Sequence, residues 1–129
     1  MKRYASGAPW EPVVGYSRAV KTGPWVLVSG TTATDAEGHL VGRGDPAAQT
    51  RQTIENIRRA LEAVGATLEQ VVRTRIYVTD IAADWEAVGR VHGEYFAAHP
   101  PATSMIEVSA LIDPDMLVEI EAVAYTGTS

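Results

Sequence analysis

Apolar residues recur along the chain with two different periods, and these periods predict alternating strands and helices. Where apolar and polar residues alternate, or short β-branched runs lie between turn residues, we expect strands at 16–20, 25–29, 71–79, 103–108 and 117–125. Two helices are expected between them because apolar residues there recur every three or four positions. Their apolar stripes are Ile54, Ile57, Leu61 and Val64, then Val88, Val91, Tyr95 and Phe96. The predicted order is β-β-α-β-α-β-β.

Capping residues predict where the two helices begin and end. Asp45 is expected to cap the first helix, with Pro46 at its first position and Gly65 as its stop. We expect Asp84 to cap the second helix and Pro100 to block its continuation. The stretch 30–44 is rich in Gly and Thr and predicts a loop.

Two helices and a mostly antiparallel sheet predict an α+β fold with both helices on one face of the sheet. On the strand 71–79, the covered face is expected to carry Val72, Thr74, Ile76 and Val78. The other face would carry Arg73, Arg75, Tyr77, Glu119 and Glu121. That face is too polar for a second helix layer, so we expect subunits of a closed homo-oligomer to meet there.

Composition narrows the possible functions. The 129 residues fit one domain, 1–129, with a substantial core. A net charge of -5 and scattered basic residues argue against nonspecific binding to nucleic acid or to a membrane surface. The absence of cysteine excludes disulfides, thiolate catalysis and zinc-thiolate sites. No apolar leader follows Met1 and no segment reaches transmembrane length, which predicts a cytoplasmic protein.

The glutamates of the last strand are candidates for acid–base chemistry. Glu119 and Glu121 lie two residues apart on one strand face, roughly 7 Å between Cα atoms. They could form an acid–base pair, but spacing alone favours cross-strand ion pairs with Arg73 or Arg75. Glu107, on the neighbouring strand, either joins this cluster or faces solvent.

Other polar residues give weaker signals. The histidines at 39, 92 and 99 lack the spacing of metal ligands, so no metal site is expected. His92 lies at the edge of an apolar stripe, which favours a packed histidine over a base in a cleft. Ser29 precedes Gly30 at a strand end, where its hydroxyl could face a ligand or simply form a turn.

Several short segments, taken in order, resemble the Rid family, also called YjgF or L-PSP, over nearly the whole chain. They are Gly15-Tyr16-Ser17, Val28-Ser29-Gly30, the runs 49–57 and 72–80, Glu94-Tyr95-Phe96, Pro101-Ala102 and the run 118–122. The resemblance implies a chorismate-mutase-like fold and a homotrimer with its sheets facing the centre. It also implies a ligand cleft at each of the three subunit interfaces.

The activity implied by this resemblance is hydrolysis of 2-imino or enamine acids to 2-keto acids, with release of ammonia and no cofactor. The matching cleft positions are Tyr16, Ser29 and Glu119. At position 103, where the family pattern has an arginine that grips a carboxylate, this chain has Thr103. Gly89 replaces the usual asparagine and Thr31 the usual glutamine.

These departures shape the expected function. We expect the trimer to bind a small carboxylate, enamine or imine, with Glu119 and Ser29 as catalytic residues. The expected ligand-binding residues are Tyr16, Thr31, His92 and Thr103. An enzyme of this kind would be a divergent imine or enamine deaminase (a hydrolase) with weak or absent activity on the usual 2-imino acids.

Two other functions stay open. One is a trimer that binds or senses a metabolite without turnover. The other is RNA cleavage, which ranks last because the chain is acidic. Three arginines on the predicted strands, Arg18, Arg73 and Arg75, could replace the cation missing at position 103.

Overall fold

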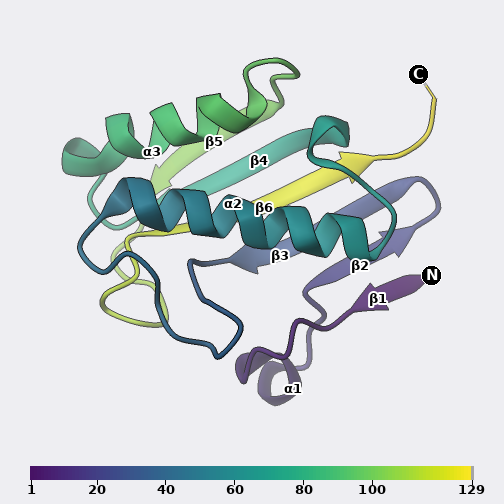
Figure 1. Ribbon diagram of the computed structural model, residues 1–129, viewed down its shortest axis with the longest axis horizontal. Coiled ribbons are helices and arrows are strands. Elements are labelled where there is room, and N and C mark those ends of the chain that lie inside the picture. The colour runs from purple at the N-terminus through teal and green to yellow at the C-terminus, as the bar shows by residue number, and fades with distance from the viewer. Residues whose placement is uncertain (129) are drawn as a thin grey trace.

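The computed structural model describes residues 1–128, which form a six-stranded sheet with two long helices across one face (Figure 1). The helices are α2 (Pro46–Ala63) and α3 (Ile81–Phe96). The strands are β1 (Lys2–Tyr4), β2 (Ala19–Thr22), β3 (Trp25–Thr31), β4 (Val71–Val78), β5 (Ala102–Glu107) and β6 (Val118–Tyr125). A 3-10 turn, η1 (Leu68–Gln70), leads into β4. The predicted α+β architecture is confirmed.

The sheet has the strand order β1-β2-β3-β6-β4-β5, so the last strand of the chain lies near its centre. The pairs β1–β2, β2–β3, β3–β6 and β6–β4 are antiparallel, and β4–β5 is parallel. The parallel pair arises because α3 carries the chain back over the sheet between β4 and β5, as parallel neighbours require. The prediction of a mostly antiparallel sheet is confirmed.

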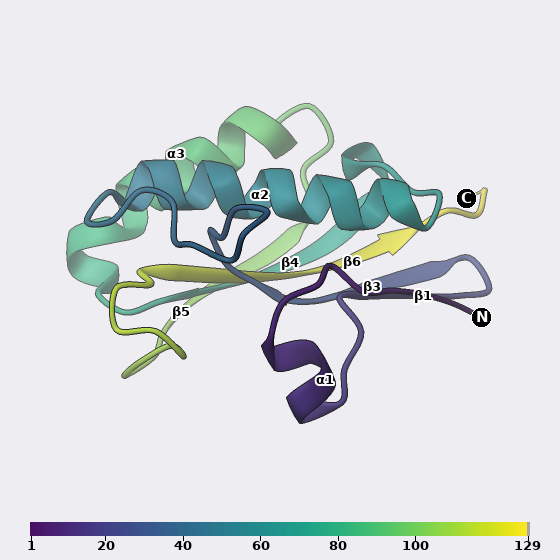
Figure 2. The ribbon, with the colours of Figure 1, turned by 60° about the horizontal axis from the view of Figure 1, so that its bottom comes forward.

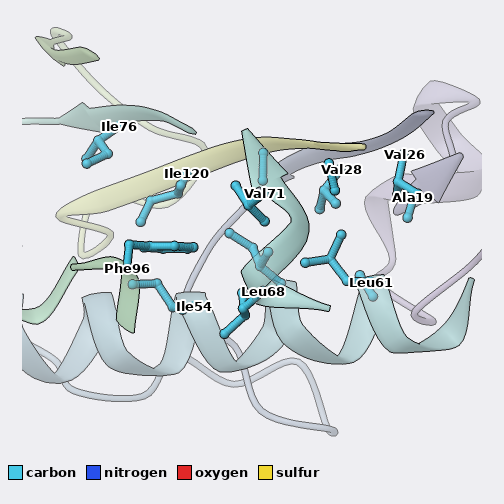
Figure 3. Packing of buried hydrophobic residues seen from close by; sticks show 14 of the residues in the cluster. Ala19, Val26, Val28, Ile54, Leu61, Leu68, Val71, Ile76, Phe96 and Ile120 are labelled. Carbon is cyan, nitrogen blue, oxygen red and sulfur yellow. The ribbon is translucent and has the colours of Figure 1, made fainter. Parts of the chain in front are cut away.

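Helix α2 begins and ends where its capping residues predict. The Asp45 side chain accepts a hydrogen bond from the Ala48 backbone N–H at 3.0 Å, and Pro46 is the first helical residue. Gly65 follows the C-terminal end with φ of 87°, a conformation that glycine adopts without steric cost. The predicted apolar stripe is buried against the sheet, and Figure 3 shows Ile54 and Leu61 pointing into that layer.

Helix α3 begins one turn earlier than the sequence predicts. Its N-cap is Asp80, which accepts from the Ala83 backbone N–H at 3.1 Å, and not Asp84, which lies in the first turn. Only Thr79 and Asp80 separate β4 from the helix, so the helix starts as soon as the chain leaves the sheet. Glu107 of β5 accepts from the Ile81 N–H at 3.0 Å, which satisfies a second free donor at this helix end.

The core lies between α2, α3 and one face of the sheet, as Figure 3 shows from close by. The sheet contributes small and β-branched side chains that alternate with the residues of the other face. Its fully or nearly fully buried apolar members are Ala19, Val26, Val28, Val71, Ile76, Val78, Val118, Ile120, Ala122 and Ala124. The face away from the two long helices carries Arg73, Arg75, Tyr77, Glu119 and Glu121, as predicted.

One predicted core position on β4 is wrong. Val72 is 45% exposed, and Val71 is buried in its place. The register between β4 and β6 shifts here, since Val71 pairs with Ala124 and Arg73 pairs with the adjacent Val123. This β-bulge inserts one residue and reverses the alternation of faces, which period-two reasoning cannot anticipate.

The N-terminal elements carry no periodic signal and were not predicted. The five-residue helix α1 (Trp10–Val14) lies on the opposite side of the sheet from α2 and α3, as Figure 2 shows with the sheet edge-on. β1 pairs with β2, whose strand begins at Ala19 and not at Tyr16. Among residues 1–128, no helix combines the length and the apolar composition that crossing a membrane requires.

Candidate functional site

Arg18, the residue just before β2, is a buried arginine that forms hydrogen bonds to several candidate residues. Its Nη2 donates to the Tyr16 hydroxyl at 3.1 Å, and its Nη1 donates to the Gly30 carbonyl oxygen and to Thr31 Oγ1. The guanidinium carbon also lies 5.3 Å from the centre of the Tyr16 ring. Arg18 is 7% exposed, so this network holds Tyr16, Gly30 and Thr31 in one fixed arrangement.

Glu11 of α1 balances the charge of Arg18. The Arg18 Nε donates to Glu11 Oε2 at 3.3 Å, and both side chains are less than a tenth exposed. The Ser6 backbone N–H donates to the other carboxylate oxygen at 3.0 Å, and the Ser6 hydroxyl donates to Oε2. This ion pair attaches α1 and the segment before it to the sheet. It also means that the Arg18 Nε already has a hydrogen-bond partner within the chain.

Ser29 lies at an irregularity in β3. The register between β3 and β6 shifts between Val28 and Thr31, which places a bulge at Ser29 and Gly30. The Ser29 hydroxyl donates to the Ser17 carbonyl oxygen at 2.6 Å, and its own carbonyl accepts from the Thr31 hydroxyl at 2.7 Å. In this arrangement the Ser29 hydroxyl offers a ligand its lone pairs, because its proton is directed to Ser17.

Glu119 of β6 lies directly against this bulge. A Cβ atom added to Gly30 would lie 2.9 Å from the carboxyl carbon of Glu119 and would overlap one of its oxygens. The absence of a side chain at position 30 therefore lets the carboxylate approach the backbone beside Ser29. In this way the structure brings the predicted residues Tyr16, Ser29, Thr31 and Glu119 to the same end of β3.

The surroundings of Glu119 favour its protonated form. Partial burial raises the pKa of this carboxyl above its ordinary value of 4.5, and the negative charge of Glu121 raises it further. The positive charge of Arg18 acts in the opposite direction and lowers the pKa. A carboxyl group whose pKa is raised in this way holds a proton more readily than an ordinary glutamate, which suits an acid–base residue.

Glu121, the second strand glutamate, is held by a tyrosine. The Tyr77 hydroxyl donates to Glu121 Oε1 at 2.6 Å, and this bond raises the pKa of Tyr77. The predicted ion pair of Glu121 with Arg73 or Arg75 does not form within 4 Å in the described part of the chain, although Arg75 lies opposite Glu121 in the register. Arg73 instead donates to Ser104 Oγ at 3.1 Å.

The other two candidates, His92 and Thr103, meet through a residue that the sequence did not single out. Thr74 of β4 is fully buried, and its Oγ1 lies 2.9 Å from His92 Nε2 and 2.8 Å from Thr103 Oγ1. Burial lowers the pKa of His92, and its ring packs 4.5 Å from that of Phe96. Glu107 caps α3 and takes no part in either group of candidate residues.

The candidates thus form two groups in a single chain. Glu119 lies opposite Tyr77 in the strand register, and both side chains are on the face away from the long helices. Thr74, which binds His92 and Thr103, is on the helix-covered face. We call the first group the carboxylate group; its members are Tyr16, Ser29, Thr31 and Glu119. The second is the Thr-His group, which consists of Thr74, His92 and Thr103. The sheet separates them within one chain.

Two hollows lie beside the carboxylate group. One, of about 330 Å³, is bounded by the N-terminal segment, the loop after β3 and residues of α2, and Arg18 and Thr31 line it. The second, about 610 Å³ and more open, is lined by Glu11 and Tyr16 among others. Neither is lined by Ser29, Glu119 or Thr103, so neither encloses the candidate chemistry.

Metal chemistry has no visible donor set in residues 1–128. No three side chains of His, Cys, Asp or Glu lie together there in a way that could hold a metal ion. The three histidines are apart: His39 is in an exposed loop near Asp35, His92 is in the Thr-His group, and His99 is exposed beyond α3.

Comparisons with known proteins find relatives along most of the chain. The family model described as Endoribonuclease L-PSP matches residues 6–126. A crystal structure from Mycobacterium tuberculosis, described as a member of the highly conserved YjgF/YER057c/UK114 family, is 52% identical with a TM-score of 0.87 and covers 96% of this chain and 98% of that one. The 3-aminoacrylate deaminase RutC of Acinetobacter baylyi is 38% identical over 114 residues, which are 88% of this chain and 89% of RutC. The structure of Escherichia coli TdcF with bound serine is 26% identical with a TM-score of 0.79 and covers 87% of this chain and 88% of that one.

Proposed function

Because the chain belongs to the Rid family, whose model is described as Endoribonuclease L-PSP, we propose that it hydrolyses a small imine or enamine without a cofactor. The observation that carries this proposal is the half-buried Glu119, held against Gly30 with a raised pKa. Similarity to a 3-aminoacrylate deaminase along most of both chains supports the same class of reaction.

Glu119 can serve two of the proton transfers that the reaction needs, the one from water and the one to the leaving nitrogen. An enamine first takes a proton on carbon from solvent and becomes a protonated imine, to whose carbon water then adds. The water proton passes to Glu119, which returns it to the nitrogen of the carbinolamine. The C–N bond then breaks, ammonia leaves, and the remaining hydroxyl loses its proton to solvent as the C=O bond forms. Ser29, with lone pairs directed away from Ser17, can accept a hydrogen bond from the attacking water or the amino group.

The proposed site lies between subunits of a homotrimer. A cleft that contains both the carboxylate group and the Thr-His group requires two chains, because the sheet separates them in one. The face away from α2 and α3 supports such an assembly, since it exposes Trp25 and Leu27, 45% and 48% accessible, beside its charged residues. Apolar surface of this kind is typical of subunit contacts.

An assay with reactive nitrogen compounds made in situ tests the activity. We expect the protein to accelerate the decay of a neutral imine made from an amino amide. It should act more weakly on 2-iminobutanoate, 2-aminoacrylate and 3-aminoacrylate, because Thr103 offers their carboxylate no cation. Decay is followed through the semicarbazone of the remaining imine. Glu119→Gln keeps the shape of the side chain and should lose about a hundredfold in rate. Glu62→Gln, an exposed change on α2, is the matched control and should leave the rate unchanged. No acceleration of the neutral imine or of any of the three acids at high protein concentration would exclude this function.

Mixed trimers test the shared cleft. Glu119→Gln and Thr103→Tyr subunits, each inactive alone, would be mixed after dissociation and reassembled. If each cleft uses Glu119 of one subunit and position 103 of the next, random mixing leaves about a quarter of the clefts intact and recovers about a quarter of the activity. Recovery of none would show that both residues act within one subunit. Light scattering checks that the assemblies are trimers.

A trimer that binds its ligand without turnover is the second candidate. The TdcF structure with bound serine favours it, because the bound molecule there is an amino acid and neither an imine nor an enamine. Calorimetric titration with serine and 2-oxobutanoate distinguishes the two functions. Binding without acceleration of imine decay supports the binding function, and acceleration abolished by Glu119→Gln supports the enzyme.

A further inference from the structure

A chain of hydrogen bonds runs from a partly buried imidazole to an exposed hydroxyl. It begins at His92 Nε2, passes 2.9 Å to Thr74 Oγ1 and a further 2.8 Å to Thr103 Oγ1. Thr74 is fully buried, so its hydroxyl has only these neighbours to satisfy it, whereas Thr103 is exposed at the edge strand β5. Thr103 also lies 3.3 Å from the Pro101 carbonyl oxygen, to which it can donate.

The proton of each hydroxyl has few possible directions. If His92 Nε2 carries no proton, Thr74 donates to it, and Thr103 must then donate to Thr74, because two lone pairs cannot face each other at 2.8 Å. If Nε2 carries a proton, the order reverses: Thr74 donates to Thr103, and the Thr103 proton has the Pro101 carbonyl as its acceptor. In both orders the Thr103 hydroxyl donates to a group of the protein, either Thr74 or the Pro101 carbonyl oxygen. Lone pairs of the Thr103 oxygen then face outward.

We infer that Thr74 and His92 position the Thr103 hydroxyl as a hydrogen-bond acceptor, so that the site selects ligands with an N–H or O–H donor at this end. The ligand class is therefore a neutral amide, an amine or an alcohol, and not a free carboxylate. This inference rests on the proposed function only in placing Thr103 in the ligand cleft.

A carboxylate is disfavoured here because its oxygens and the outward-facing oxygen of Thr103 are both hydrogen-bond acceptors. A carboxylate has no proton to share, so next to Thr103 it would give up hydration and gain no bond. An amide of the same shape can donate its N–H to Thr103 and avoids this loss. Burial lowers the pKa of His92, which disfavours an imidazolium that could attract a carboxylate through its charge.

A matched pair of ligands tests the inference. Dissociation constants of 2-oxobutanamide and 2-oxobutanoate would be measured by NMR titration of the intact protein. The wild type should bind the amide about tenfold more tightly than the acid. Thr103→Val should abolish this preference, Thr103→Ser should retain it, and Thr103→Arg should reverse it because a guanidinium pairs with a carboxylate.

The two positioning residues have their own test. Thr74→Val and His92→Phe should each reduce the amide preference at least about threefold. In both variants the Thr103 proton loses Thr74 as its acceptor and keeps only the Pro101 carbonyl oxygen, 3.3 Å away, so it can turn outward to a ligand. Thr74→Ser is the conservative control and should keep the preference. Thermal unfolding of each variant separates a change in ligand preference from a loss of fold, since a merely structural role would weaken both ligands equally.

The outcomes separate this inference from the proposed reaction. Equal binding of both ligands by the wild type, or tighter binding of the acid, overturns the inference even if imines are hydrolysed. A preference for the amide that Thr103→Val removes supports it even if no imine is hydrolysed. An amide preference that survives Thr103→Val shows that another residue sets it and also overturns the inference.

Discussion

The carboxylate of Glu119 fills the space that a side chain at Gly30 would need. Gly30 does not have a positive φ, so its backbone would accept alanine and only the added methyl group would disturb the site. Gly30→Ala should therefore displace Glu119 and reduce imine hydrolysis by at least about tenfold while the fold is retained. Steady-state rates and circular dichroism of the variant check this.

The control for that substitution is Gly93→Ala in α3, where an added Cβ meets nothing within 4 Å. This change should leave activity intact and stabilise the helix by up to about 1 kcal/mol, because alanine has the higher helix propensity. If Gly30→Ala is as active as Gly93→Ala, Glu119 does not need its position beside the bulge.

Stability should depend on pH through Glu119. Its pKa is raised above 4.5 in the folded protein, so folding favours the protonated form and stability is lost as pH rises through the window above 4.5. Glu119→Gln has no such titration and should be more stable than the wild type at neutral pH. The difference in free energy of unfolding should shrink as pH falls toward 4.5.

Urea unfolding of both proteins between pH 4.5 and 7.5, at one fixed protein concentration, measures that difference. A gap that stays constant over this range would show that the Glu119 pKa is not raised by folding. A gap that widens as pH falls would mean that the pKa is lowered, as in a salt bridge.

The buried ion pair between Glu11 and Arg18 should be costly to break from one side. Arg18→Met leaves the Glu11 carboxylate, only 4% exposed, without its cation and should destabilise the protein by about 3–5 kcal/mol. The double variant Glu11→Leu with Arg18→Met removes both charges and should recover much of this loss. Chemical denaturation of the two variants gives the comparison.

An exposed pair provides the contrast. Arg90 and Glu86 lie 2.7 Å apart on the surface of α3, and Arg90→Met should cost less than about 1 kcal/mol because solvent screens both charges. A similar cost for Arg18→Met would mean that the Glu11–Arg18 pair does not anchor α1.

The two aspartates at the start of α3 should differ in their contribution to stability. Asp80→Ala removes the side chain that caps the Ala83 N–H and should cost about 1 kcal/mol. Asp84→Ala should cost much less, because burial and the charge of Asp80 already raise the pKa of Asp84 and disfavour its ionised form. The melting temperatures of the two variants check this. A larger loss of stability for Asp84→Ala than for Asp80→Ala would show that Asp80 is not the N-cap of α3.

Residue pattern and neighbouring signals were sufficient for much of the fold. The cap at Asp45, the stop at Gly65 and the stripe through Ile54 and Leu61 all act within a few residues, so a local pattern contains them. The same holds for the alternating faces of β6, which correctly place Glu119 on the face away from the long helices. Chain order and local signals therefore predicted the α+β layer and two long helices.

Local reasoning was wrong where two distant segments adjust to each other. Val72 lies outside the core because β4 and β6 pair through a bulge. The N-cap of α3 is Asp80 and not Asp84, because the helix begins immediately after β4. Glu121 turned to Tyr77, although an arginine lies opposite it, because the phenol reaches the carboxylate from two residues further along β4.

The sequence by itself determined which residues could act: an alternating strand that presents Glu119, a serine before a glycine, and a threonine in place of an arginine. Only the tertiary structure decided how they are grouped. It made Arg18 the centre of one group and Thr74 the link between His92 and Thr103. The physical reason is that a hydrogen bond depends on distance and direction between atoms, and residues far apart in the chain acquire these only when the sheet brings their strands together.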